Sequence, residues 1–215
     1  LLNGTQNYAN GTKQTYLNNG TGIFTLADGI TYASAGANTG LVLNVINNNP
    51  TANSFNVGDL GGLTNVTLRV GGTGVVRFAG SSAGDLFSGS GNLQVLSGAT
   101  FDLNGNGEGM GAIFGEGTIR LSSGAGASMA AGGHYVFSGK LTANGTVGVA
   151  GTTHVLELSG STSDYTGATS VTAGRLIISA NAPSGSAGAL GNATSEVLVG
   201  NVSSTANSTL LIGAA

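Results

Sequence analysis

The amino-acid sequence predicts an all-β protein, and more specifically a parallel β-helix with short strands and glycine or asparagine corners. Three observations support this prediction: short runs in which apolar and small polar residues alternate, a high glycine content, and very few charged residues. The pattern continues along the whole chain, so residues 1–215 are interpreted as one β-helical segment. A β-sandwich is the alternative fold for strands at this spacing.

The strand signal is an alternation over three to six residues, interrupted by Gly, Asn or Ser. Side chains of a strand point alternately to its two faces, so a period of two is typical of strands with one buried face. The runs recur at roughly 8–12-residue spacing, which is the all-β pattern. The predicted strands are 23–26, 66–70, 93–96, 100–103, 118–121, 154–158, 175–178 and 197–199.

Glycine, with 40 of the 215 residues, argues against helices. In a helix it is about 1 kcal/mol less favourable than alanine, and few stretches of ten residues lack it. The chain has only two prolines and no strict Gly-X-Y period, which excludes collagen.

Two segments favour a coil over a sandwich. Residues 93–103 contain two runs separated by Ser97 and Gly98, and residues 171–178 repeat this arrangement with Ala-Gly as the corner. Two short strands bent at a glycine are successive faces of one coil. Stacked coils bury the inward apolar rows and pair each backbone group with the coils above and below. At about 20–25 residues per coil, the chain makes roughly nine coils and a rod about 40–45 Å long.

Asn-Gly pairs are compatible with both folds. They favour two-residue hairpins, but they also suit solenoid corners, where single residues adopt left-handed backbone conformations. The pairs are Asn3–Gly4, Asn10–Gly11, Asn19–Gly20, Asn104–Gly105 and Asn144–Gly145.

The surface is predicted to be nearly neutral. Charged residues make up 7% of the chain and the net charge is −3, whereas globular domains carry about 25% charged residues. Polarity comes instead from Asn, Thr, Ser and Gly, which suits stacking against copies of the same chain, end to end or laterally. Six Lys and Arg spread over the whole chain cannot neutralise a phosphate backbone, so nucleic-acid binding is excluded.

Cysteine is absent, which removes disulfides, thiolate zinc sites and cysteine nucleophiles. No run of 18 apolar residues occurs, so no transmembrane helix is expected. The last residues, 210–215, have the pattern of a strand with more to follow. The chain is therefore expected to be a segment of a longer repetitive surface protein.

The most specific pattern lies in residues 154–200. It contains LELSG at 156–160, DYTGAT at 164–169, VTAGRL at 171–176, ALGN at 189–192 and EVLVG at 196–200. This resembles the autotransporter-associated β-strand repeat; residues 63–150 match it more loosely, and residues 1–55 match it weakly. The resemblance implies a right-handed parallel β-helix, as in autotransporter passenger domains and very large bacterial surface proteins. It also implies a place outside a bacterial cell, and no particular activity.

No catalytic, cofactor-binding or metal-binding residue is predicted, and the chain is not expected to be an enzyme. Its two histidines, His134 and His154, each begin an apolar alternation and are predicted to be surface residues at strand edges. A polysaccharide-degrading β-helix would need clustered acids. The carboxylates are dispersed along the chain: Asp28, Asp59, Asp85, Asp102, Asp164, Glu108, Glu116, Glu157 and Glu196.

Residues 102–108, from Asp102 to Glu108, resemble the start of a calcium loop, D-x-[DN]-x-[DN]-G. The closing acid is missing, because Ile113 occupies the twelfth position. A structural corner is therefore favoured over a calcium site. The eight Asn-x-Ser/Thr sequons are explained by a composition rich in Asn, Gly and Thr.

The leading functional hypothesis is a non-enzymatic extracellular β-solenoid that acts as a surface stalk, a matrix component or a self-associating fibre subunit. The alternative is a glycan-binding adhesin module, in which Tyr8, Tyr16 and Tyr32 stack on sugars of a surface glycan. A polysaccharide-degrading enzyme is the third and least favoured hypothesis.

Overall fold

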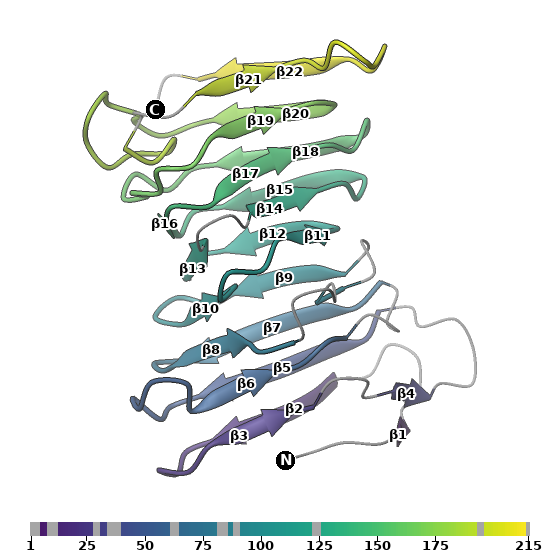
Figure 1. Cartoon of the computed structure of the whole chain (residues 1–215), viewed down its shortest axis with the longest axis vertical. Coiled ribbons are helices and arrows are strands. Elements are labelled where there is room, and N and C mark those ends of the chain that lie inside the picture. Colours follow the sequence, from purple (N-terminus) through teal and green to yellow (C-terminus); the bar gives the residue numbers. More distant parts are fainter. Residues whose placement is uncertain are drawn as a thin grey trace.

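The computed structural model describes the side chains and backbone of most of the chain, and Figure 1 shows its path. The described residues are 13–27, 40–60, 65–80, 86–87, 91–121, 126–192 and 196–213, together with the backbone of 5–7 and 31–33. Every regular element within them is a β-strand. In this part of the chain no helix is long and apolar enough to cross a membrane.

The strands stack into sheets along the rod, and the nine-stranded sheet runs from β2 to β22 (Figure 1). The nine-stranded sheet contains β2 (Lys13–Asn18), β5 (Val42–Asn47), β7 (Thr67–Gly72), β9 (Asn92–Val95), β12 (Ala112–Gly115), β15 (Gly133–Phe137), β18 (His154–Leu158), β20 (Gly174–Ile178) and β22 (Ser208–Ile212). The six-stranded sheet contains β3 (Phe24–Leu26), β6 (Phe55–Val57), β8 (Val75–Phe78), β10 (Thr100–Asp102), β13 (Thr118–Leu121) and β16 (Lys140–Ala143).

A five-stranded sheet closes the later coils on a third side. It contains β11 (Glu108–Met110), β14 (Gly126–Met129), β17 (Thr146–Val149), β19 (Thr169–Val171) and β21 (Val197–Val199). The short strands β1 (Thr5–Asn7) and β4 (Thr31–Ala33) pair with each other.

The pairing between described strands is parallel throughout, which is the arrangement of a β-solenoid and not of an antiparallel sandwich. The predicted parallel β-helix is therefore confirmed. The nine-stranded sheet is the longest stack, because it takes one strand from each passage of the chain along that side of the rod.

Coil length varies along the rod. In the first half Leu43 pairs with Leu68, and in the second half Val155 pairs with Arg175, so the later coil is the shorter one. The end coils are longer than predicted, because Lys13 pairs with Val42 and Gly174 pairs with Ser208. In the last coil the extra residues lie in the segments that connect β20, β21 and β22, while the strands keep their register.

The core is a stack of inward-pointing side chains inside the coil. Leu43, Leu68 and Leu93 lie in register on consecutive strands and are fully buried. Burying one such side chain contributes about 1.5–3 kcal/mol. On the six-stranded sheet Phe24 packs against Phe55, with ring centroids 4.8 Å apart and the ring planes tilted by 34°. Because each inward side chain rests on the coils above and below, a single coil cannot bury its core alone.

Two predicted corners are confirmed. Ser97 and Gly98 form a turn between β9 and β10, and Gly98 has a φ of 81°. Asn104 and Gly105 both have positive φ, 54° and 82°, as expected for an Asn-Gly corner. The pairs Asn3–Gly4 and Asn10–Gly11 lie outside the described residues.

Candidate functional site

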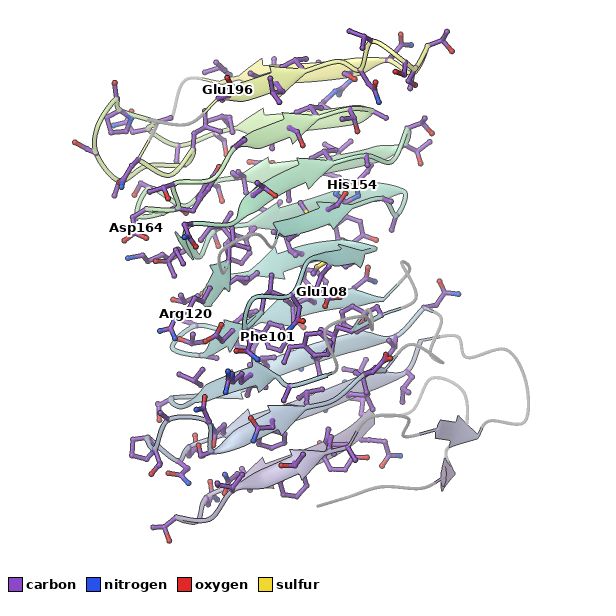
Figure 2. The ribbon with its side chains drawn as sticks, in the orientation of Figure 1. Phe101, Glu108, Arg120, His154, Asp164 and Glu196 are labelled. Carbon is purple, nitrogen blue, oxygen red and sulfur yellow. The ribbon has the colours of Figure 1, made fainter. Side chains whose placement is uncertain are left out.

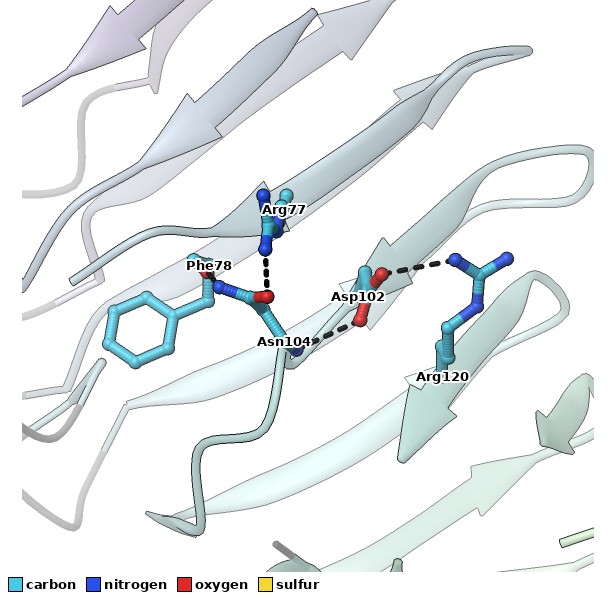
Figure 3. A network of polar contacts seen from close by, with 5 residues as sticks. All are labelled: Arg77, Phe78, Asp102, Asn104 and Arg120. Atoms are coloured by element: carbon cyan, nitrogen blue, oxygen red, sulfur yellow. Dashed lines mark hydrogen bonds and ion pairs between the residues drawn. The ribbon is translucent and has the colours of Figure 1, made fainter. Parts of the chain in front are cut away.

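The corner after β10 holds a polar network (Figure 3). Asp102 Oδ1 accepts a hydrogen bond from the backbone N–H of Asn104 (2.8 Å), and its Oδ2 pairs with Arg120 Nη1 at 3.1 Å. The Asn104 side chain accepts a hydrogen bond from Arg77 and donates one to the Phe78 carbonyl oxygen (3.0 Å). The network therefore ties β8, β10 and β13 together.

This geometry favours a structural corner at residues 102–108 over a calcium site. Both carboxylate oxygens of Asp102 already contact an N–H donor or a cation, and Ile113 is buried in β12. Glu108 points into the solenoid, where its Oε2 accepts a hydrogen bond from the Leu86 N–H at 2.7 Å. Nowhere in the described ranges do three His, Cys, Asp or Glu side chains gather as metal ligands would. In Figure 2, Glu108, Asp164 and Glu196 lie at different levels along the rod.

A second polar cluster lies on the outer surface of the nine-stranded sheet. Glu157 accepts a hydrogen bond from Ser179 (2.7 Å), and its other oxygen lies 2.9 Å from His134 Nε2. The Ser179 contact, followed by that of His134, lowers the pKa of Glu157. A hydrolytic triad needs the base between the nucleophile and the acid. Here the acid lies in the middle, so the hydroxyl is bound by a carboxylate and is not activated by a base.

The prediction for His154 was wrong: this side chain is fully buried, whereas His134 is exposed as expected. The alternation of β18 explains the error, because His154 shares its inward face with Leu156 and Leu158. Its Nδ1 lies 2.5 Å from the Ala131 carbonyl oxygen, to which it must donate. The ring stacks on Tyr135, with centroids 5.5 Å apart. Burial lowers the pKa of His154, and the Ala131 hydrogen bond partly opposes this shift.

The three tyrosines proposed for glycan stacking are only partly described. Tyr8 and the side chain of Tyr32 lie outside the described residues. Tyr16 is half-buried, points to the inner side of β2 and contacts Phe24, with ring centroids 6.1 Å apart. Its ring therefore belongs to the packing of the first coil.

The surface best suited to an interaction is the open coil at the end of the rod, formed by β21 and β22 (Figure 1). Its inward apolar side chains lie in register with buried residues of the coil below. Val171 is 0% exposed but its partner Val199 is 50% exposed, and Ile178 is 1% exposed but its partner Ile212 is 70% exposed. Among the described residues, no strand pairs with β21 or β22 on the side away from β19 and β20, so no described coil covers these side chains. The open coil also presents Val197, Leu198 and Leu211 to solvent.

Comparison with protein-family models, with curated proteins and with solved structures gives no match. The resemblance of residues 154–200 to the autotransporter-associated repeat rests on the motif residues alone and stays a prediction.

Proposed function

We propose that this chain is a non-enzymatic structural β-solenoid of a bacterial surface stalk, matrix or fibre, which extends by stacking coil on coil outside the cell. The open coil carries this proposal. Its two strands, β21 and β22, lie at the edges of their sheets. They expose the apolar side chains of Val199 and Ile212, whereas the residues in register with them on the preceding coil are buried. An unpaired edge of this kind is a template for another strand.

The low charge of the chain supports the same function. Proteins that must stay monomeric protect sheet edges with charged residues, especially lysine. Neither β21 (Val197–Val199) nor β22 (Ser208–Ile212) contains a charged residue. A coil added to this end would continue the inward columns and cover Val199 and Ile212.

The polar clusters support a structural role as well. The Asp102–Arg120 pair and the Lys140–Asp164 pair (2.6 Å) each connect different coils. The Glu157 cluster connects β15, β18 and the residue after β20. Each of them ties neighbouring coils together.

Sedimentation velocity and electron microscopy of the 1–215 chain test the proposal. The wild type is expected to form species heavier than the 20.8 kDa monomer and rods longer than a single copy of the solenoid. Replacing Val199 and Ile212 together by lysine places two charges at positions that an added coil would cover. The variant should therefore remain monomeric. Val202→Lys is the control, because Val202 lies in the same coil, between β21 and β22, but is fully exposed.

Two results would contradict end-to-end stacking. One is a wild-type chain that stays monomeric at high concentration. The other is assembly that persists unchanged in the double lysine variant, which would place the contact elsewhere on the rod.

A further inference from the structure

A groove on the outer face of the nine-stranded sheet has no role in the stacking proposed above. It has a volume of about 310 Å³ and crosses β2, β5 and β7 to reach Leu96, directly after β9. We call it the Arg69 groove; it is lined by Thr15, Asn44, Ile46, Arg69, Gly71 and Leu96. Its volume is at the lower end of the range of small-ligand pockets, about 300–1,000 Å³.

The floor of the groove is made by one glycine. Ile46, Gly71 and Leu96 are neighbours on successive coils, and the first and last are the apolar walls. A Cβ at position 71 would lie 3.4 Å from Leu96 Cδ1 and 3.8 Å from Ile46 Cγ1, so the methyl group of an alanine would fit there. The fold therefore does not require glycine at this position. Glycine inside a strand often marks a place where a ligand approaches closely.

Arg69 supplies the charge of the groove. It has no hydrogen bond or ion pair with any residue that the structure describes, and its Nε is buried without a partner there. In the same described ranges Arg120 and Lys140 are paired with Asp102 and Asp164. The strands β2, β5, β7 and β9 contain no acidic residue. Within the described part of the chain, Arg69 is thus a half-buried cation without a carboxylate partner, which favours an anionic ligand.

Two amides flank the guanidinium group along the rod. Asn44 on β5 and Gln94 on β9 are directly in register with Arg69 on β7. Asn44 Nδ2 donates to Thr15 Oγ1 at 3.2 Å, which continues the polar row to β2. Because adjacent strands are about 4.8 Å apart, Asn44, Arg69 and Gln94 form a row of hydrogen-bond donors and acceptors beside an apolar wall.

We infer that the Arg69 groove binds an acidic saccharide, a pyranose that carries a carboxylate. The guanidinium group matches a carboxylate in two-pronged geometry. The amides of Asn44 and Gln94 bind ring hydroxyls, and the apolar walls Ile46 and Leu96 contact the C–H face of the sugar. Because the groove opens sideways, it stays accessible when coils stack at the end of the rod. The inference therefore does not depend on the proposed assembly.

Calorimetric titration of the wild-type chain with trigalacturonate at low ionic strength tests the inference, with maltotriose as the uncharged trisaccharide. Trigalacturonate is expected to bind and maltotriose to bind at least tenfold more weakly. Arg69→Gln should weaken trigalacturonate binding at least tenfold. Arg175→Gln is the matched control, since it removes the same charge from the outer side of β20 and should leave the affinity within twofold.

The Gly71→Val variant gives a second, independent test of the groove. It fills the floor between Ile46 and Leu96 and should abolish binding, with a cooperative thermal transition showing that the variant is folded. Absence of trigalacturonate binding to the wild type, equal binding of maltotriose, or equal losses in Arg69→Gln and Arg175→Gln would overturn the inference. A change of sedimentation coefficient in Gly71→Val with unchanged saccharide binding would instead assign the groove to a second copy of the chain and would also overturn it.

Discussion

The corner between the nine-stranded and six-stranded sheets is built in two different ways at the two ends of the rod. In the early coils it is an asparagine corner, made by Asn18, Asn47, Asn49 and Ser54, which are buried. Asn47 Nδ2 donates to Ser54 Oγ (3.0 Å) and to the Val75 carbonyl oxygen (2.8 Å). Asn18 Nδ2 donates to the Ser54 carbonyl oxygen at 3.0 Å. Side-chain amides thus satisfy backbone groups that a bent strand leaves out of its ladder.

In the later coils the same place is a glycine corner, formed by Gly117, Gly139 and Gly160. A Cβ on Gly139 would lie 1.9 Å from the Gly117 carbonyl oxygen, and one on Gly160 would lie 2.2 Å from that of Gly139. The Gly117 carbonyl oxygen accepts the Lys140 N–H at 2.9 Å. Here backbone satisfies backbone, because the absence of side chains lets successive corners touch.

The difference shows that one solenoid can solve the same hydrogen-bonding problem with long corners or with short ones. Amide corners take more residues than glycine corners: residues 48–54 separate β5 from β6 in the coil that runs from Val42 to Thr67, whereas residues 138–139 separate β15 from β16. Glycine corners need close contact, which fits the shorter coil between Val155 and Arg175. The stability of an asparagine corner should depend on particular hydrogen bonds. The stability of a glycine corner should depend on the absence of the Cβ atom.

The largest expected effect is that of Gly139→Ala. The added Cβ meets backbone atoms on the coil below, which cannot rotate away as a side chain could. We expect a loss of about 3 kcal/mol or more in the free energy of unfolding, at the upper end of overpacking effects. Urea titration measures it. Gly109→Ala is the control, because nothing lies within 4 Å of a Cβ at that position; equal losses in both variants would contradict the close-contact explanation.

Asn47→Ala should have the next largest effect. It removes two donors and leaves the Val75 carbonyl oxygen and the Asn49 N–H (3.2 Å from Asn47 Oδ1) buried without this partner. Unsatisfied buried groups cost about 1–3 kcal/mol each, so a loss of about 2–3 kcal/mol is expected in urea titration. Asn44→Ala removes an outward amide with one exposed hydrogen bond and should change stability by less than about 0.5 kcal/mol. A small effect at both positions would mean that the asparagine corner does not stabilise the early coils.

Much of the fold could be predicted from the sequence because short alternation survives in many strands. The ranges 118–121, 154–158 and 197–199 are strands with the predicted bounds. Strands such as β11 and β17 were missed, since glycines at outward positions (Gly109 and Gly148) remove the polar half of the pattern. The phase of β18 was also missed, and with it the burial of His154, because a histidine does not mark either face by itself.

The candidate sites could not be predicted in the same way. Val171 and Val199 are the same residue type in register, and only their place in the stack makes one buried and the other exposed. The Arg69 groove depends on Ile46, Gly71 and Leu96 meeting on successive coils, which requires the register between distant strands. Tertiary position, and not local pattern, decides both features.

A smaller effect is expected from pH, again in the later coils. Burial lowers the pKa of His154 in the folded state, so the unfolded chain binds the proton more readily. Stability should therefore be full above the ordinary histidine pKa of about 6.5 and fall as pH drops below it. Urea midpoints at about pH 7.5 and about pH 5 measure this slope. His154→Phe keeps a ring beside Tyr135 and should flatten the slope, and an unchanged slope would assign the pH dependence to other groups.

The smallest expected effect is a gain, at a glycine that belongs to neither corner. Gly71→Ala should stabilise the chain by about 0.4–1 kcal/mol, because alanine restricts the unfolded chain and its Cβ meets only ordinary contacts with Leu96 and Ile46. Differential scanning calorimetry would show a higher melting temperature. Replacement by alanine would then lower stability at Gly139 and raise it at Gly71. This difference separates a glycine that the fold requires from one that it tolerates. A loss of stability in Gly71→Ala would mean that the outer face of β7 is already closely packed. The glycine at position 71 would then no longer support ligand binding in the Arg69 groove.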